Sequence, residues 1–305
     1  MQLSASARNA LARQAGSLNE KRLFAGFDAH GTASGPAGRC ADAARLLADC
    51  GLVCHVVGAA EPAEPNEAFS AFTSAFGART LPSTTALSAI DYDACLRATG
   101  EGKFLDLLSR ADLFYLSGWG YLPKFGSLLA DLLERGFAML GDLNPRTFLL
   151  DFSHTGKARA FELASLLDSA RKYRSRGSVC AHFNAAEAAM AGKLIGFRSS
   201  DEEPATAEAL TPLAHQLRQN LEAAHVTIEG ADFAVAADRY EVVSRSVDMP
   251  LPDSDNRSGA TFAATYGLAA MLGLPLRDAL ETAAAAKHLQ AVHQSLPNLD
   301  DLLLG

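Results

Sequence analysis

Residues 22–57 read RLFAGFDAHGTASGPAGRCADAARLLADCGLVCHVV, and two kinds of pattern alternate along this stretch. Arg22–Phe27 and Leu52–Val57 are short apolar runs, typical of buried strands. Between them, Asp28–Gly38 is rich in Gly, Ala and Ser and is predicted to be a loop, whereas Cys40–Cys50 has helical periodicity. A strand, a helix and a second strand in this order predict a βαβ unit with parallel strands.

The rest of the chain continues the alternation of strands and helices. Further strands are predicted at Leu87–Tyr92, Ala111–Leu116, Thr147–Phe152, Ser178–Phe183 and His225–Ile228, followed by a hairpin of Phe233–Ala236 and Tyr240–Val243. Helices are predicted near the start of the chain and at Asn66–Phe76, Gly126–Arg135, Phe161–Arg171, Ser258–Leu272 and Leu276–Gln294. Glu61–Pro65 and Ser199–Ala205 are predicted to be disordered, but both are too short for a domain linker. We therefore expect an α/β fold: one doubly wound domain over residues 1–305, with a mainly parallel central sheet and helices on both faces.

The composition narrows the class of protein. The 305 residues are 49% apolar and 20% charged, which is ordinary for a globular protein, and the net charge is −8. The chain has no dense stretch of Lys and Arg that would suggest a nucleic-acid partner. It also has no run of about 18 apolar residues that would suggest a membrane span. Five cysteines without a CxxC pair argue against a disulfide framework and a zinc site. Without a signal-peptide pattern, a cytoplasmic location is expected.

In an open α/β sheet, ligands bind outside the carboxyl ends of the strands. Gly26–Asp28, Ser117–Trp119, Ser153–His154 and Asn184 follow predicted strands, so we expect them to lie along one edge. Asp28 there would accept hydrogen bonds from substrate hydroxyl groups; alternatively, it caps a helix or is simply solvated.

Asn184 and Glu187 stand where a predicted strand turns into a helix. Asn at the cap with Glu three residues later is the pattern of a capping box, which is a purely structural feature. Alternatively, Glu187 organises a hydrated Mg²⁺, because that ion keeps its waters and is often held by one or two carboxylates.

The loop Asp253–Phe262 precedes a helix of small residues, ATFAATYGLAAMLG. Ala260 is predicted to start this helix, with its first free amides forming an anion site in the crevice. The alternative is a helix that simply packs tightly through Ala and Gly. Neither the GxGxxG pattern nor the GxxxxGK[ST] phosphate loop is present.

Four stretches, taken in order, resemble the ribokinase-like superfamily and especially its PfkB-type sugar and nucleoside kinases. They are Ala25–Gly51, Asp91–Pro123, Phe183–Gly192 (FNAAEAAMAG, similar to the family's N-x-x-E motif) and Asp255–Lys287. The resemblance covers roughly Leu23 to Val292. It implies the ribokinase-like fold, a small-molecule substrate and ATP with Mg²⁺ as cofactors, and it allows a homodimer.

The resemblance also implies roles for individual residues. Asp28, Gly38 and Asp42 would bind the substrate. Asn184, Thr227 and Gly230 would bind the nucleotide, and Glu187 would order Mg²⁺. Gly259 would keep part of the anion hole, and Asp255 is the nearest carboxylate that could replace the catalytic base.

The chain departs from the family pattern at the positions that carry the chemistry. The family loop Gly-Ala-Gly-Asp corresponds to Arg257–Ala260, so a methyl group replaces the catalytic Asp. Glu229 follows the strand that normally runs into a Gly beside the nucleotide phosphates, where a carboxylate would repel them. Cys40 and Asp42 replace a Gly and the frequent substrate-binding Asn.

The substrate-covering lid is expected to be reduced or absent. The connection from Asp28 to Gly35 is too short for two paired strands and a turn, although a small flap from Leu87–Leu96 is compatible with the sequence.

Two functions therefore stay open: an impaired kinase acting on a sugar, nucleoside or related alcohol, or an inactive pseudokinase that binds ligands or regulates. A third, less favoured, is different chemistry on the same fold through Asp28, His154 or His182.

Overall fold

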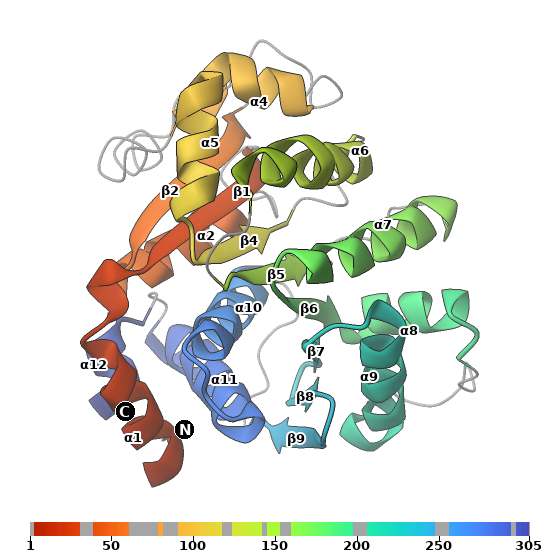
Figure 1. Cartoon of the computed structure of the whole chain (residues 1–305). Coiled ribbons are helices and arrows are strands. Elements are labelled where there is room, and N and C mark those ends of the chain that lie inside the picture. Colours follow the sequence, from red (N-terminus) through yellow and green to blue (C-terminus); the bar gives the residue numbers. More distant parts are fainter. Residues whose placement is uncertain are drawn as a thin grey trace.

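The computed structural model describes residues 3–30, 39–60, 79–81, 91–117, 124–141, 145–152, 160–197, 206–247, 256–293 and 297–304. Within these ranges the strands form one sheet in the order β3-β2-β1-β4-β5-β6-β7-β8-β9 (Figure 1). The strands are β1 Arg22–His30, β2 Val53–Ala60, β3 Arg79–Leu81, β4 Leu113–Leu116, β5 Thr147–Asp151, β6 Ser178–Asn184, β7 His225–Glu229, β8 Phe233–Ala237 and β9 Val242–Ser246. Neighbouring strands from β3 to β7 pair in parallel. The pairs β7–β8 and β8–β9 are antiparallel.

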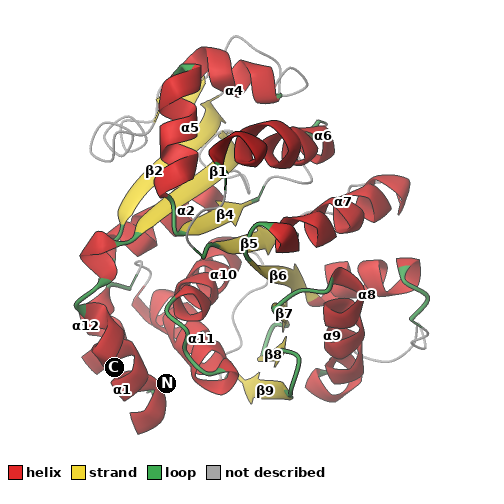
Figure 2. Ribbon diagram, in the orientation of Figure 1, coloured by secondary structure: helices red, strands yellow, loops and turns green. Residues whose placement is uncertain are grey.

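Helices cover both faces of this sheet (Figure 2). One face carries α4 Tyr92–Thr99, α5 Glu101–Arg110, α6 Phe125–Asp131, α7 Ala160–Lys172, α8 Ala185–Leu194 and α9 Ala207–Leu221. The other carries α1 Ala5–Ala15, α2 Arg39–Asp49, α10 Asn256–Met271, α11 Leu276–His293 and α12 Leu299–Leu304. The predicted doubly wound α/β fold is therefore confirmed, while its extent as a single domain over residues 1–305 stays a prediction.

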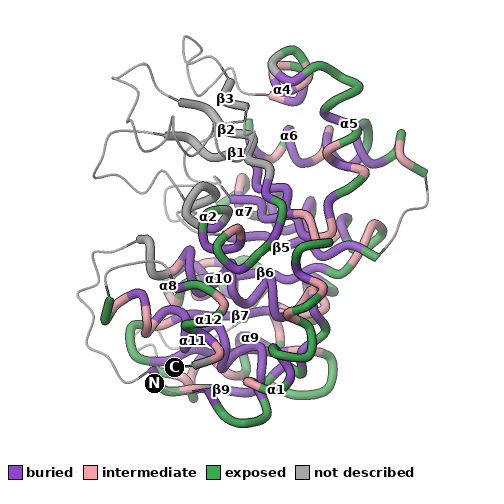
Figure 3. The backbone as a smooth tube through the Cα atoms, turned by 90° about the vertical axis from the view of Figure 1, so that its left-hand side faces the viewer, coloured by how far each residue is buried: buried purple, intermediate pink, exposed green. Residues whose placement is uncertain are grey.

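The alternation of side chains along the strands explains the two cores. Leu113 and Tyr115 of β4 point into the core beneath α10, whereas Phe114 and Leu116 point into the opposite core. Successive strand residues face opposite sides, so strands buried on both faces read as continuous apolar runs. Figure 3 shows the resulting continuous burial through the middle of the sheet. In the described part of the chain, no helix has the length and apolarity needed to cross a bilayer.

Most of the predicted elements are confirmed. The expected strands at β1, β2 and β4–β7 are present, and so is the hairpin, although its second strand begins at Val242. Local capping accounts for several helix starts: the side chains of Ser4, Asp91 and Thr206 accept hydrogen bonds from backbone amides of α1, α4 and α9.

Two element predictions were wrong at their boundaries. Strand β1 continues to His30, so Asp28 lies in a strand and not in the predicted loop. The pairing of β1 with β2 shifts register between Gly26 and Asp28 and then continues to His30 and Ala60. Tyr92, predicted to end a strand, is the first residue of helix α4, because Asp91 caps that helix.

Other sequence predictions concern residues outside the described ranges. They are the helix Asn66–Phe76, the disordered patches Glu61–Pro65 and Ser199–Ala205, and most of the segments expected to form a reduced lid or flap. These stay predictions.

Candidate functional site

The strand ends converge as the fold rule requires. Because β1, β4, β5 and β6 are parallel neighbours, Asp28, Ser117 and Asn184 lie along one edge of the sheet. The chain reverses its direction of travel across the sheet between β1 and β4, which is the switch point where ligands bind in such folds. This prediction is confirmed for the described residues; Gly118–Trp119 and Ser153–His154 lie outside them.

The substrate-binding candidates are placed only through their backbone. Asp28 lies in β1 and Asp42 in α2, while Gly38 lies outside the described residues. Strand β1 brings the backbone of Asp28 to the switch point between β1 and β4. Their roles toward a substrate stay predictions.

Asn184 and Glu187 form the capping box that their spacing predicts. The Glu187 amide donates to Asn184 Oδ1 at 2.9 Å, and the Asn184 amide donates to Glu187 Oε2 at 2.9 Å. Glu187 is buried, with 3% of its surface exposed. The capping role is therefore real, and a role toward Mg²⁺ would be additional. Among the described residues, no group of three or more His, Cys, Asp and Glu side chains is arranged to hold a metal.

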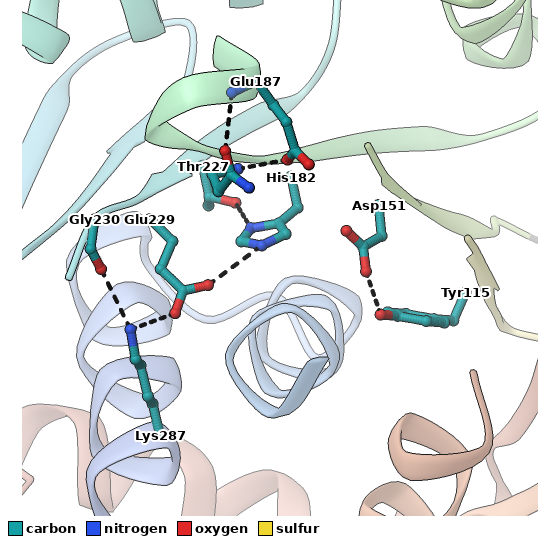
Figure 4. Close-up of polar contacts among 9 residues, drawn as sticks. Tyr115, Asp151, His182, Glu187, Thr227, Glu229, Gly230 and Lys287 are labelled. Carbon is teal, nitrogen blue, oxygen red and sulfur yellow. Dashed lines mark hydrogen bonds and ion pairs between the residues drawn. The ribbon is translucent and has the colours of Figure 1, made fainter. Parts of the chain in front are cut away.

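The end of β7 carries a buried polar network that joins the sheet to α11 (Figure 4). Lys287 Nζ lies 2.5 Å from Glu229 Oε1 and donates to the Gly230 carbonyl oxygen at 3.3 Å. His182 Nε2 lies 3.4 Å from Glu229 Oε2, and His182 Nδ1 lies 3.0 Å from Thr227 Oγ1. Glu229 is the register partner of Asn184, so this network adjoins the capping box.

Lys287 changes what Glu229 does at this strand end. Burial by itself raises the pKa of Glu229, but the Lys287 ammonium and the His182 side chain outweigh it and lower that pKa to about 2. Glu229 is thus ionised, and its charge is compensated inside the protein. The sequence prediction that this carboxylate simply repels phosphates was incomplete, because its positive partner is 58 residues further along the chain.

The low pKa of Glu229 predicts acid sensitivity. A carboxyl group whose pKa falls from about 4.5 in the unfolded chain to about 2 in the folded one stabilises the fold fully above pH 4.5. That stabilisation is lost as the pH falls toward 2, and about 2 kcal/mol of it should be gone by pH 3. Urea unfolding at pH 5.5 and pH 3 measures this loss. Glu229→Gln should lose about 2 kcal/mol less over the same interval; equal losses in the two proteins would contradict the assignment.

Gly230 is required by packing in the turn between β7 and β8. A Cβ atom at this position would lie 2.3 Å from the Phe233 ring, and the Gly230 amide donates to the Phe233 carbonyl oxygen at 2.9 Å. Thr227 is buried within β7 and faces His182. Thr227 and Gly230 thus sit at the same strand end as Asn184, but each has a structural partner.

The prediction that Ala260 starts a helix was wrong by one turn. Helix α10 begins at Asn256, so Gly259 is its fourth residue and Ala260 its fifth, and the amides that lack partners within the helix are those before Gly259. Ala260 is fully buried. Its methyl group therefore fills space at the position where the resemblance places a base. Asp253 and Asp255 lie outside the described residues.

Sequence reasoning missed a second buried polar pair. The Tyr115 hydroxyl donates to Asp151 Oδ2, and both side chains are fully buried at the ends of β4 and β5. In Figure 4 this pair and the Glu229 network lie on either side of a helix. A carboxylate ending the apolar run TFLLD, and a Lys ending AAAAK, were the available signals.

Comparison with known proteins rests on structure alone. No protein family matches the sequence. No curated protein matches it either. Solved structures do match: phosphofructokinase-2 from Escherichia coli in complex with fructose-6-phosphate has a TM-score of 0.59 at 13% identity, covering 93% of this chain and 96% of that one.

Two further structures show the same similarity. Ribokinase from Thermotoga maritima has a TM-score of 0.59 at 12% identity, covering 93% of this chain and 98% of that one. Pyridoxal kinase from Staphylococcus aureus in complex with pyridoxal has a TM-score of 0.57 at 15% identity, covering 89% and 88%. Together with the sheet order and the converging strand ends, these matches show that the chain has the fold of the ribokinase-like superfamily.

Proposed function

We propose that this protein is a small-molecule kinase that transfers the γ-phosphoryl group of ATP slowly to a hydroxyl group of a sugar, nucleoside or related alcohol. The observation that carries the proposal is the convergence at one sheet edge. The switch point beside Asp28 and the network at the end of β7 lie there, and Phe262, near the start of α10, packs against the ring of His182 in that network.

The proposal assigns a role to each residue. Asp28, Gly38 and Asp42 hold the alcohol, and the free amides that precede Gly259 at the start of α10 stabilise negative charge on the phosphoryl group. Asn184, Thr227 and Gly230 border the nucleotide. Bound Mg-ATP would supply the phosphoryl group, and Glu187 would order the water shell of the ion. Asp255 is the carboxylate that would accept the proton of the hydroxyl group in place of the missing base.

Slow turnover follows from Ala260. A positioned general base contributes roughly 10²–10⁴-fold to the rate, whereas positioning and electrostatics supply most of the rate acceleration in phosphoryl transfer.

The proposal also includes a cytoplasmic location and a homodimer. The direct experiment is incubation with Mg-ATP and a panel of sugars, nucleosides and pyridoxal, with mass spectrometry of the phosphorylated alcohol. Product that requires the protein supports the proposal; none from any alcohol in the panel argues against it.

Glu187→Gln separates the structural and metal roles of that residue. Gln preserves the capping box, so the free energy of unfolding should change by less than about 0.5 kcal/mol. The loss of charge should raise the Mg²⁺ concentration needed for half-maximal turnover several-fold. Asn184→Ala is the matched control: it removes the cap and should destabilise the protein by about 1 kcal/mol. An unchanged Mg²⁺ dependence in Glu187→Gln would leave Glu187 with the capping role alone.

The second candidate is an inactive pseudokinase that binds ligands or regulates. It is favoured by the buried methyl group of Ala260, which cannot act as a base, and by the ion pair in which Glu229 already binds Lys287. This candidate predicts ligand binding without any phosphorylated product, even after long incubation.

A further inference from the structure

The Glu229–Lys287 pair needs an explanation beyond stability. Both side chains are buried, with 8% and 5% of their surfaces exposed. A buried ion pair commonly stabilises a protein no better than apolar residues of similar volume, because both charges lose their hydration. The best-attested use of such pairs is to specify an arrangement or to act as a switch.

Lys287 has donor capacity left over. An ammonium group carries three N–H donors. Within the part of the chain that the structure describes, Lys287 has two acceptors, Glu229 Oε1 and the Gly230 carbonyl oxygen. The third donor of a buried cation is thus available for an oxygen atom from outside the protein.

The pair also stands at a place where ligands arrive. Glu229 ends β7 directly beside Asn184, and Gly230, whose carbonyl oxygen Lys287 contacts, is partly exposed. The carboxyl edge of the sheet is the ligand edge of this fold class. A cation here suits an oligophosphate, whose oxygen atoms accept charge-assisted hydrogen bonds.

We propose that Lys287 is a phosphate-binding residue whose charge is occupied by its ion pair with Glu229. This ion pair keeps the nucleotide site in a low-affinity form. The inference rests on the proposed function for the identity of the nucleotide. A phosphate chain gains Lys287 only by competing with Glu229, and its own charge is repelled by that carboxylate. Removing the charge of Glu229 while keeping its shape therefore increases affinity.

The test is calorimetric titration of the whole chain with inorganic tripolyphosphate, which needs no turnover. Glu229→Gln should bind the probe at least tenfold more tightly than wild type. The double variant Glu229→Gln/Lys287→Met should show none of this gain. The matched control is Glu222→Gln, which releases Arg174 from an ion pair at the surface and should leave the affinity unchanged.

The outcomes separate cleanly. Equal or weaker binding by Glu229→Gln, or a gain that persists in the double variant, overturns the inference. If Glu229→Gln does not fold, wild type against the double variant decides: retained binding without Lys287 overturns the inference, and its loss supports it. A gain in Glu229→Gln without any phosphorylated alcohol would sink the proposed kinase activity but leave the phosphate site standing. If phosphorylated alcohol forms but wild type and Glu229→Gln bind tripolyphosphate equally, the proposed kinase activity stands and the inference about Lys287 is overturned.

Discussion

Ala260→Asp should raise the rate of phosphorylated product by up to about 10²–10⁴-fold, the range that a positioned general base contributes, reduced by whatever part of that contribution Asp255 already supplies. Ala260 lies just after the first turn of α10, and helical side chains tilt toward the N-terminus of their helix. A carboxylate at this position would therefore extend toward the first turn, where the proposal places the phosphoryl group. Initial rates with the best alcohol from the panel, at saturating Mg-ATP, measure the gain.

Ala260→Asn is the control for this substitution, because it has nearly the same shape and cannot take a proton. Since Ala260 is fully buried, both variants should be less stable than wild type, and thermal unfolding should show similar losses. A rate increase in Asp but not in Asn identifies base catalysis. Equal rates in the two folded variants would show that the missing base is not what limits turnover.

Lys287→Met should cost about 3–5 kcal/mol of the free energy of unfolding at pH 7. The substitution leaves the Glu229 carboxylate buried without its main positive partner, at a distance of 2.5 Å in the intact pair. Removing one member of a buried pair is costly because the other charge stays desolvated. Urea unfolding of wild type and variant, followed by circular dichroism, measures the loss.

Two controls isolate the buried charge. Glu229→Gln/Lys287→Met removes both charges and should recover most of the loss. Lys172→Met breaks an exposed pair with Asp168 and should cost no more than about 1 kcal/mol. If the double variant is as unstable as Lys287→Met, the loss comes from packing around the lysine side chain and not from an uncompensated carboxylate.

Local patterns in the sequence predicted the elements well where one pattern dominated. Thr147–Phe152 and Ser178–Phe183 are apolar runs buried on both faces, and both formed strands. The Asn184–Glu187 spacing predicted the capping box because both hydrogen bonds are made within four residues. The converging strand ends followed from the parallel alternation of elements.

The start of α10 was harder to predict for a local reason. Asp253, Ser254, Asp255, Asn256 and Ser258 are all residue types that cap helices, so the sequence offers several starting points. The continuation of β1 past Phe27 depends on pairing with β2, which no local pattern encodes.

The Glu229 network could not be predicted from local sequence at all. Its members come from β6, β7 and α11, and they meet only because α11 packs beside the end of the sheet. The lone Lys in AAAAK was visible, but its partner was not. The predicted repulsion of phosphates by Glu229 therefore took no account of its ion pair with Lys287.

Calorimetric titration of the wild-type chain with Mg-ATP and Mg-ADP tests the account most directly, because every step of the proposed transfer requires a working nucleotide site. The account predicts saturable binding of Mg-ATP, weakened by Glu229 but within the range of about 1 μM to 1 mM usual for enzyme substrates. Wild type should bind more weakly than Glu229→Gln. The absence of detectable heat with either nucleotide, in both wild type and Glu229→Gln, would contradict the assignment of this sheet edge as a nucleotide site.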